Sequence, residues 1–263
     1  MKELAKGQYS GNKIAEVENT LFTTSVTYYT PESFDNTRHS HPNAHLSFVL
    51  KGGCEEQKSD KYERGLLSST FYHRDEPHQI NMMSKNSIHL NIDFDPLFIQ
   101  EINTENTVEL ITKKDFSLPL EMMQLYKELY AKDDVKPLAI EEAVLGMFGT
   151  DKSTSLYKTP PLWVEQIKQY LQEYWDKSIT LEELSQITGL HKISISKHFS
   201  KFTGCTISTY QRKLRVYHAL ELINNGEQSL SQIALQCGFA DQSHFIRFFK
   251  QYTGFLPKKF EQL

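Results

Sequence analysis

The stretch from residue 238 to residue 260 reads GFADQSHFIRFFKQYTGFLPKKF, and it repeats an earlier stretch, residues 189–210, that reads GLHKISISKHFSKFTGCTISTY. The opening glycines lie forty-nine residues apart, and from Ile195 and Phe245 onward the offset is fifty, so the second copy has one extra residue after its glycine. An internal repeat of this detail indicates that the chain builds one structural unit twice. We interpret each copy as a helix-turn-helix.

The helix that follows the glycine in each copy has two contrasting faces, because successive residues turn by about 100° around a helix. The apolar stripe contains Ile195, Phe199 and Phe202 in the first copy, and Phe245, Phe249 and Tyr252 in the second. The opposite face contains Ile193, Lys197, Ser200 and Lys201, and correspondingly Ser243, Arg247, Lys250 and Gln251. The basic face of a single helix is usually just solvated. Its recurrence on both helices instead indicates that the two faces bind the same kind of ligand. The DNA major groove accepts one such helix.

The elements around these two helices also follow from the sequence. An apolar pattern predicts a helix of about four turns after Pro160-Pro161, and Thr180 with Glu183 is typical of a capping box at the next helix. Leu181, Leu184 and Ile187 are expected to form the apolar face of that helix. Residues 208–225 predict one long helix that Gly226 ends. At 1.5 Å per residue it would span roughly 27 Å. Such a rod could hold two recognition helices about one DNA turn, roughly 34 Å, apart.

The net charge of −4 conceals a division between the two halves of the chain. From Pro160 onward there are twelve Lys and Arg against nine Asp and Glu, whereas the rest of the chain has seventeen against twenty-four. The positive charge that phosphate contacts require therefore lies in the repeated half. So small an excess disfavours an architectural protein that binds DNA without sequence preference, since such proteins depend on many phosphate contacts.

Residues from about 162 to 260 resemble the DNA-binding domain of the AraC/XylS family of bacterial transcription regulators. The matching stretch is Ile233-Ala234, Cys237-Gly238-Phe239, Ser243 to Phe245, Arg247, Phe249-Lys250, Thr253-Gly254 and Pro257. The resemblance implies a seven-helix domain whose two recognition helices enter adjacent major grooves of promoter DNA. Carried over by position, it implies that the base-reading residues are Ile193, Ser196, Lys197, Gln242, Ser243, Ile246 and Arg247.

Two basic residues on the same faces, Lys201 and Lys250, are expected to contact phosphates. Lys197 stands where the family often has Arg, and Lys cannot form the rigid two-pronged contact that Arg makes with guanine. This is the one departure from the family pattern among the base-reading positions.

The first half of the chain has the texture of a small all-β barrel or sandwich. Stretches rich in Val, Thr, Tyr, Phe and Leu, at 21–29, 44–50 and 87–94, are separated by Pro, Gly, Asn and Asp. Together with the repeated half, this predicts an α+β multidomain chain. Its parts are an N-terminal β-barrel or sandwich followed by helices, and a C-terminal all-α domain with two helix-turn-helix motifs.

Histidines cluster in this first half. His39, His41 and His45 lie in the run RHSHPNAH, and Glu76-Pro77-His78 follows later. The pattern is similar to the first two motifs of cupin barrels, in which the positions matching His39, His41 and His78 are metal ligands and His45 stands near the usual Glu. Imidazole clusters suit Fe, Ni, Zn or Cu. Three interpretations are open: a pocket for a small-molecule effector, a divalent metal site, or structural histidines. His73 and His89 are expected to be ordinary barrel residues.

The sequence predicts four segments. Residues 1–95 are the cupin-like effector-sensing domain, residues 96–150 a helical segment with a homodimer interface, residues 151–161 a linker, and residues 162–263 the double helix-turn-helix domain. No signal peptide and no run of eighteen apolar residues is found, and Cys54, Cys205 and Cys237 show no CxxC pattern. We expect a cytoplasmic protein that makes no membrane contact.

The expected function is sequence-specific transcription regulation, more often activation than repression on family grounds, with RNA polymerase as a partner and a small-molecule effector as the signal. No catalytic residues and no cofactor are expected beyond the divalent metal considered above. The alternative from another class is a cupin metalloenzyme or metal sensor with an attached DNA-binding domain, in which His39, His41, His45 and His78 hold iron.

Overall fold

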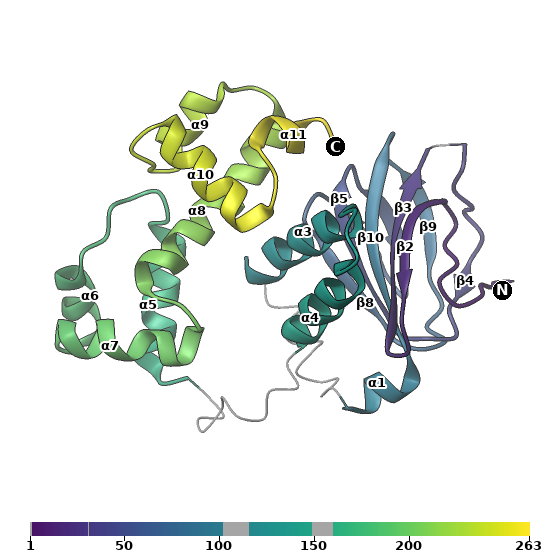
Figure 1. Ribbon diagram of the computed structural model, residues 1–263, viewed down its shortest axis with the longest axis horizontal. Helices are drawn as coiled ribbons and strands as arrows, with labels where there is room; N and C mark the ends of the chain where they lie inside the picture. The colour runs from purple at the N-terminus through teal and green to yellow at the C-terminus, as the bar shows by residue number, and fades with distance from the viewer. Residues whose placement is uncertain (1, 31, 102–115, 149–159) are drawn as a thin grey trace. The chain divides into compact units, whose positions relative to one another are not determined.

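The computed structural model describes residues 2–30, 32–101, 116–148 and 160–263 (Figure 1). The chain divides into two compact units, Met1–Thr150 and Asp151–Leu263. The first unit carries all the strands of the described residues, and the second is helical throughout its described part. Mixed sheet and helix in the first unit with helices alone in the second matches the predicted α+β organisation. Most of the predicted linker, 151–161, lies outside the described residues.

A five-stranded antiparallel sheet forms the centre of the first unit. Its order is β2 (Asn12–Glu18), β3 (Phe22–Tyr29), β10 (Ser87–Phe94), β5 (His45–Lys51) and β8 (Ser69–Tyr72). The three central strands are those predicted at 21–29, 44–50 and 87–94, to within one or two residues. Their β-branched and aromatic residues pack well on a pleated surface, so the predicted strands are confirmed.

The central sheet has one apolar face and one polar face, because alternate side chains of a strand point to opposite sides. On β10, Leu90 and Ile92 are fully buried on one face, while His89 and Asn91 are buried on the other. The apolar face is covered by helices, and the ring of Phe94 lies 5.0 Å from that of Phe148 in α4 (Lys136–Phe148). The buried polar face therefore needs partners within the unit, and it supplies one wall of the histidine cavity.

The remaining strands form two smaller sheets. One has the order β7 (Lys61–Arg64), β6 (Cys54–Gln57) and β9 (Gln79–Met83). In the other, β1 (Lys2–Glu3) pairs in parallel with β4 (His39–Ser40). A single bridge joins His39 to His78. The described strands thus form separate sheets and not a closed barrel. Of the two folds predicted from the sequence, a barrel or a sandwich, the sandwich describes them better.

Three helices follow the strands within the described part of the first unit: α1 (Pro96–Glu101), α3 (Ser117–Leu129) and α4. Helix α3 packs against α4 and contacts β2 and β5. Leu120 and Met123 of α3 and Val144 of α4 are buried, whereas Tyr130, directly after α3, is exposed. These helices therefore cover the sheet, and the predicted dimer interface stays a prediction.

Seven helices make up the described part of the second unit. They are α5 (Leu162–Glu173), α6 (Leu181–Thr188), α7 (Lys192–Thr203), α8 (Ile207–Asn225), α9 (Leu230–Gln236), α10 (Gln242–Thr253) and α11 (Pro257–Glu261). The seven helices agree with the seven-helix domain that the family resemblance implied, and the long helix α8 ends at Gly226, whose φ is a left-handed 68°. No helix within the described ranges is long and apolar enough to cross a membrane.

The caps of these helices repeat as the sequences do. The capping box of Thr180 and Glu183 at α6 is present as predicted, and Ser229 and Gln232 form the same box at α9. The predicted inward face of α6 is only partly correct: Leu184 is buried, but Leu181 and Ile187 are largely exposed. An eight-residue helix against two neighbours buries one narrow stripe, so the flanking apolar residues remain at the surface.

Candidate nucleic-acid interface and histidine cavity

The two recognition helices, α7 and α10, are built alike. Each has twelve residues and ends at a glycine in the left-handed region, Gly204 at φ 70° and Gly254 at φ 80°. The Thr203 hydroxyl donates to the carbonyls of Phe199 and Cys205, and the Thr253 hydroxyl lies within hydrogen-bond distance of the equivalent carbonyls of its own copy. The repeat therefore extends to the hydrogen bonds that end each helix.

On α7, the four predicted contact residues all lie at the surface. Ile193 is 66% exposed, and Ser196, Lys197 and Lys201 are exposed as well. Ile195 and Phe199 are fully buried on the opposite side, while Phe202 is half-buried beside the ring of Trp163. The predicted inner and outer faces of α7 are therefore correct, and the basic side chains are free to approach a ligand.

On α10 the predicted residues divide into two groups. Ser243, Arg247 and Lys250 are exposed, whereas Gln242 and Ile246 are half-buried. The Ser231 hydroxyl of α9 donates to the side-chain oxygen of Gln242 at 2.6 Å. Half of the Gln242 amide is thus engaged by the preceding helix, which leaves Ser243 and Arg247 as the exposed base-reading side chains predicted on α10.

Helix α8 joins the two helix-turn-helix motifs and holds them through one side chain. The Arg215 guanidinium donates to the carbonyls of Trp175 and Lys177, at 3.0 Å and 2.7 Å, and also to the carbonyl of Gly238. Trp175 and Lys177 precede α6, whereas Gly238 lies in the turn between α9 and α10. Burial lowers the pKa of Arg215, but an arginine stays charged at any physiological pH. One cation therefore connects both motifs to the rod between them.

Gly238 is required at this junction for steric reasons. A Cβ on Gly238 would lie 2.2 Å from the carbonyl oxygen of Asp176 and 2.9 Å from the Arg215 guanidinium carbon, and the φ of Gly238 is 70°. Gly226 has nearly the same φ of 68°, but no heavy atom lies within 4 Å of its Cβ position. The two glycines therefore separate the cost of backbone strain from the cost of a collision.

We expect Gly238→Ala to destabilise the helical unit more than Gly226→Ala. The left-handed conformation alone costs a residue with a Cβ about 1–2 kcal/mol, which both variants bear, whereas only Gly238→Ala also disrupts the Arg215 contacts. Urea unfolding of the full chain, followed by the fluorescence of Trp163 and Trp175, measures the difference. Equal losses of unfolding free energy in the two variants would show that the junction tolerates a side chain.

In the first unit, three of the predicted histidines converge. The nearest ligand atoms of His39, His41 and His78 all lie within 4.8 Å of one another, and the three residues are buried. The Nδ1 atoms of His39 and His78 lie 2.8 Å and 3.1 Å from the carbonyl oxygens of Thr37 and Glu76. Such a contact is satisfied when Nδ1 carries the proton, which leaves Nε2 as the free lone pair.

The fourth predicted histidine, His45, belongs to the same cavity but is held differently. Its ring lies 4.4 Å from that of His41 and stacks on Tyr72, with centroids 4.3 Å apart and planes 8° apart. His45 is not one of the three residues whose ligand atoms meet. The structure therefore separates the four predicted histidines into a converging trio and a neighbour that lies against Tyr72.

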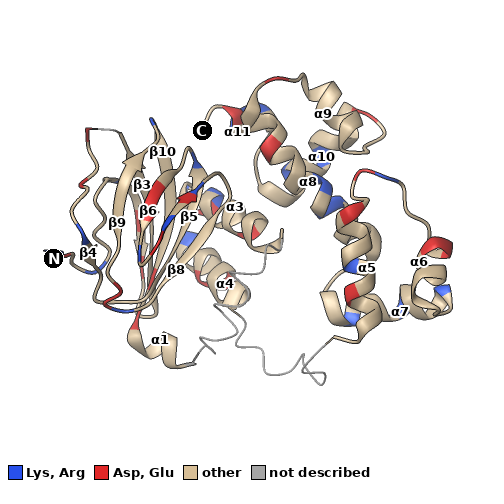
Figure 2. Cartoon of the chain, turned by 180° about the vertical axis from the view of Figure 1, so that it is seen from behind, with Lys and Arg blue, Asp and Glu red and all other residues tan. Residues whose placement is uncertain are grey.

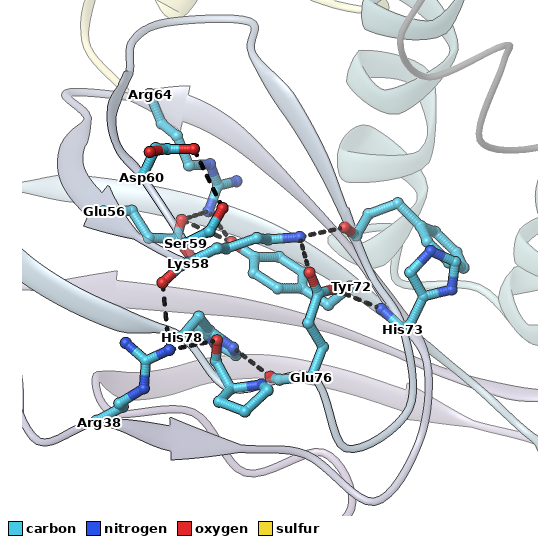
Figure 3. Close-up of polar contacts among 12 residues, drawn as sticks. Arg38, Glu56, Lys58, Ser59, Asp60, Arg64, Tyr72, His73, Glu76 and His78 are labelled. Atoms are coloured by element: carbon cyan, nitrogen blue, oxygen red, sulfur yellow. Dashed lines mark hydrogen bonds and ion pairs between the residues drawn. The ribbon is translucent and has the colours of Figure 1, made fainter.

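A buried charged network that the sequence interpretation missed lies beside the histidines (Figure 3). Arg64 donates to the Glu56 carboxylate at 3.3 Å, to the Tyr72 hydroxyl at 2.8 Å and to the carbonyl of Ser47 at 2.8 Å. The Tyr72 hydroxyl lies 2.7 Å from Glu56. Strand alternation at residues 54–57 and 61–64 gave no sign of it, because Glu56 and Arg64 read as ordinary surface charges.

The cavity between these groups is lined largely by polar side chains. Its wall includes the four histidines and Arg64, together with Tyr9, His89 and Asn91. Among the described residues, the Tyr9 hydroxyl, His41 Nδ1, Arg64 Nε and Asn91 Oδ1 are buried there without a hydrogen-bond partner. Buried polar atoms are normally paired, so these four atoms indicate a site for a polar ligand, ion or water. The expectation for His89 as an ordinary barrel residue missed this lining position, whereas His73 is exposed.

Four imidazoles of the cavity, those of His41, His45, His78 and His89, are held neutral. Burial, with the neighbouring imidazoles, lowers the pKa of His41 to about 3, and burial lowers that of His78 to about 4. Burial also lowers the pKa values of His45 and His89. Neutral imidazole is the form that binds metal. The donor set, its burial and the orienting carbonyls therefore fit a divalent transition metal as well as a polar organic ligand.

Because the folded-state pKa values of His41 and His78 lie below the unfolded value of about 6.5, the unfolded chain binds more protons in mildly acidic solution. The stability that neutral histidines contribute is complete above about pH 6.5 and is lost as the pH falls toward the folded-state values. Relative to neutral pH, each of the two histidines should lower the free energy of unfolding by about 2 kcal/mol at pH 5. Urea unfolding of chelator-treated protein between about pH 7.5 and pH 5 measures this loss, which His78→Gln should reduce. A flat profile would contradict the neutral cluster.

Comparisons with known proteins match the helical unit. Residues 184–262 match the model of a family described as "Helix-turn-helix domain". The probable transcription factor PqrA of Proteus vulgaris is 31% identical over 87 residues, which are 33% of this chain and 71% of that protein. The chain belongs to the AraC/XylS family of transcription regulators.

Two further matches cover the same unit. The bifunctional transcriptional activator/DNA repair enzyme AdaA of Bacillus subtilis is 30% identical over 101 residues, 38% of this chain and 48% of that protein. A probable AraC family transcriptional regulator of Rhodopseudomonas palustris has a crystal structure that covers 38% of this chain and 94% of that one, at 29% identity and a TM-score of 0.37. The match to AdaA spans about half of that relative's length, and the matches to YbfI of Bacillus subtilis and to two RhaS activators span between 29% and 36% of those proteins.

Proposed function

We propose that this member of the AraC/XylS family is a sequence-specific transcription regulator that binds double-stranded promoter DNA through α7 and α10. The observation that carries the proposal is the duplicated construction of the two helices, each with an apolar face buried in its motif and a basic face left exposed. Figure 2 shows the basic positions in this unit in blue. Two equal helices joined by a rod suit adjacent major grooves better than any single groove.

Within this proposal the residues have distinct roles. Lys197 and Arg247 read base edges together with Ile193, Ser196, Gln242, Ser243 and Ile246, whereas Lys201 and Lys250 bind phosphates. Several relatives are named transcriptional activators, including RhaS and RhaR, which supports activation as the direction of regulation. RNA polymerase would then be the protein partner. A homodimer formed through α3 and α4 would present two such readers.

We expect Arg247→Ala to reduce the preference for a selected DNA site over a shuffled one by about 1–3 kcal/mol, or roughly five- to 150-fold. Lys250→Ala should instead weaken both duplexes alike and reduce the slope of affinity against salt by about 0.9. Fluorescence anisotropy on a duplex selected from a random library with the full chain gives both quantities. Equal losses on both duplexes for Arg247→Ala would exclude its base-reading role.

The signal that controls this reader is proposed to bind in the cupin-like first unit, within the cavity of His39, His41, His45 and His78. Unpartnered polar atoms of its wall, among them the Tyr9 hydroxyl and Asn91 Oδ1, support a small polar effector. An effector can change DNA binding only by favouring one of two arrangements of the protein over the other. Pairing of these buried polar atoms with a bound effector would supply that difference in free energy.

A divalent metal ion is the second candidate for this cavity, because three imidazoles converge there with two Nδ1 atoms placed on backbone carbonyls. His39, His41 and His78 would hold the ion, and His45 would stand beside it. A bound ion would supply a fixed positive charge and a coordination position for a small ligand. This candidate covers both the metal sensor and the metalloenzyme interpretations.

Metal binding predicts that protein incubated with Zn²⁺, Ni²⁺ or Fe²⁺ and then desalted retains close to one ion per chain. His78→Ala should lose most of that ion, because two imidazoles bind far more weakly than three. His73→Ala, which removes an exposed histidine of the same unit, is the matched control. Elemental analysis gives the ratio, and fewer than about one ion per ten chains in the wild type would remove the metal candidate while leaving the organic effector.

A further inference from the structure

The second motif carries a cationic cluster that joins Arg247 to Arg212, a residue with no role assigned above. The guanidinium carbons of Arg212, on α8, and Arg247, on α10, both lie 4.7 Å from the centroid of the Phe248 ring. A cation within about 6 Å of an aromatic centroid is attracted to the ring. One phenyl ring therefore holds two arginines that come from different helices.

The Phe248 ring is itself held in place. It is 91% buried, with His244 at 4.9 Å and Tyr252 at 5.9 Å along the same face of α10, and Phe239 at 6.4 Å from the preceding turn. The spacing of four residues from His244 to Phe248 and from Phe248 to Tyr252 stacks these rings one turn apart. A ring fixed in this way can orient the planar guanidinium groups that lie on it.

The two arginines lack the anion that their positions call for. Neither forms an ion pair with a carboxylate within the described ranges, and the Nε atom of Arg212 is buried without a partner. The polar contact recorded for the Arg212 guanidinium is to the hydroxyl of Thr209 at 3.2 Å. Two like charges near one ring repel each other, and a bound anion would offset that repulsion.

We propose that Arg212 is a phosphate-binding residue of the DNA interface, and that Phe248 is a positioning residue that holds Arg212 and Arg247 for one segment of DNA. The proposal rests on the proposed function, since it takes α10 to be a recognition helix. With Arg247 directed to a base edge, Arg212 would bind a backbone phosphate of the same segment. Helix α8 would then contribute a contact of its own as well as spacing.

The first motif has no equivalent arrangement. The position fifty residues before Phe248 is His198, which is half-buried next to Lys197, and no cation lies over its ring among the contacts of the described residues. The cluster is therefore a property of the second motif. It distinguishes α10 from α7 beyond the difference between Arg247 and Lys197.

The experiment measures affinity at several salt concentrations for the full chain on its selected duplex and on a shuffled duplex. Arg212→Gln should weaken both about five- to tenfold near physiological salt and reduce the salt slope by about 0.9, the value for one lost phosphate contact. Lys213→Gln, which removes the same charge from the neighbouring position of α8, is the matched control. Equal effects of the two variants on affinity and on slope would overturn the role of Arg212.

Phe248 is tested by two substitutions. Phe248→Leu keeps an apolar side chain but removes the ring, so it should reduce both the salt slope and the preference for the selected duplex. Phe248→Tyr keeps the ring and should retain the wild-type values of both. Thermal unfolding checks that each variant is folded. Wild-type behaviour of folded Phe248→Leu, or failure of Phe248→Tyr to retain binding, would overturn the positioning role. Loss of all sequence preference in the wild type would instead reject the proposed function.

Discussion

The Arg215 guanidinium is the interaction on which the helical unit depends most. It bonds to carbonyls on both sides of α8, from the segment before α6 and from the turn before α10. Carbonyl oxygens at loop ends are otherwise left to water, and here one cation satisfies three of them. The Arg215 hydrogen bonds therefore add to the packing of both motifs against α8. They make two small motifs behave as one reader.

The helical unit could be predicted almost completely from the sequence, because its information is local. Glycines such as Gly226, the capping pair of Thr180 and Glu183, and the aromatic stripe of α10 each act within one or two turns of helix. The repeat supplied a second copy of each signal. Leu181 and Ile187 were placed in the core wrongly, because helical periodicity identifies a face but not how wide a stripe the neighbouring helices cover.

The histidine cavity could be predicted only in part. His39, His41 and His45 lie close together in sequence, and His78 was added by resemblance to cupins. The partners that define the cavity come from distant strands: Arg64 from β7, Tyr72 from β8 and Asn91 from β10. Nothing local marks a lone Arg or Glu as buried, since ionised residues are rarely inside unless paired. Only the pairing of strands shows that Glu56 and Arg64 meet and thus form a neutral wall.

The braced rod also has a consequence for the DNA. Helix α8 has nineteen residues, so it is about 28 Å long, and Arg215 removes the swivel that a flexible tether would allow. In the proposed complex, α7 and α10 would then keep a fixed rotation about the DNA axis relative to each other. Inserting about five base pairs between their target sequences would turn one of them to the far side of the duplex, and no rearrangement of a tether could compensate. Under the proposed function, the promoter sites of this chain would therefore need a constant spacing between their two target sequences, even where individual bases differ.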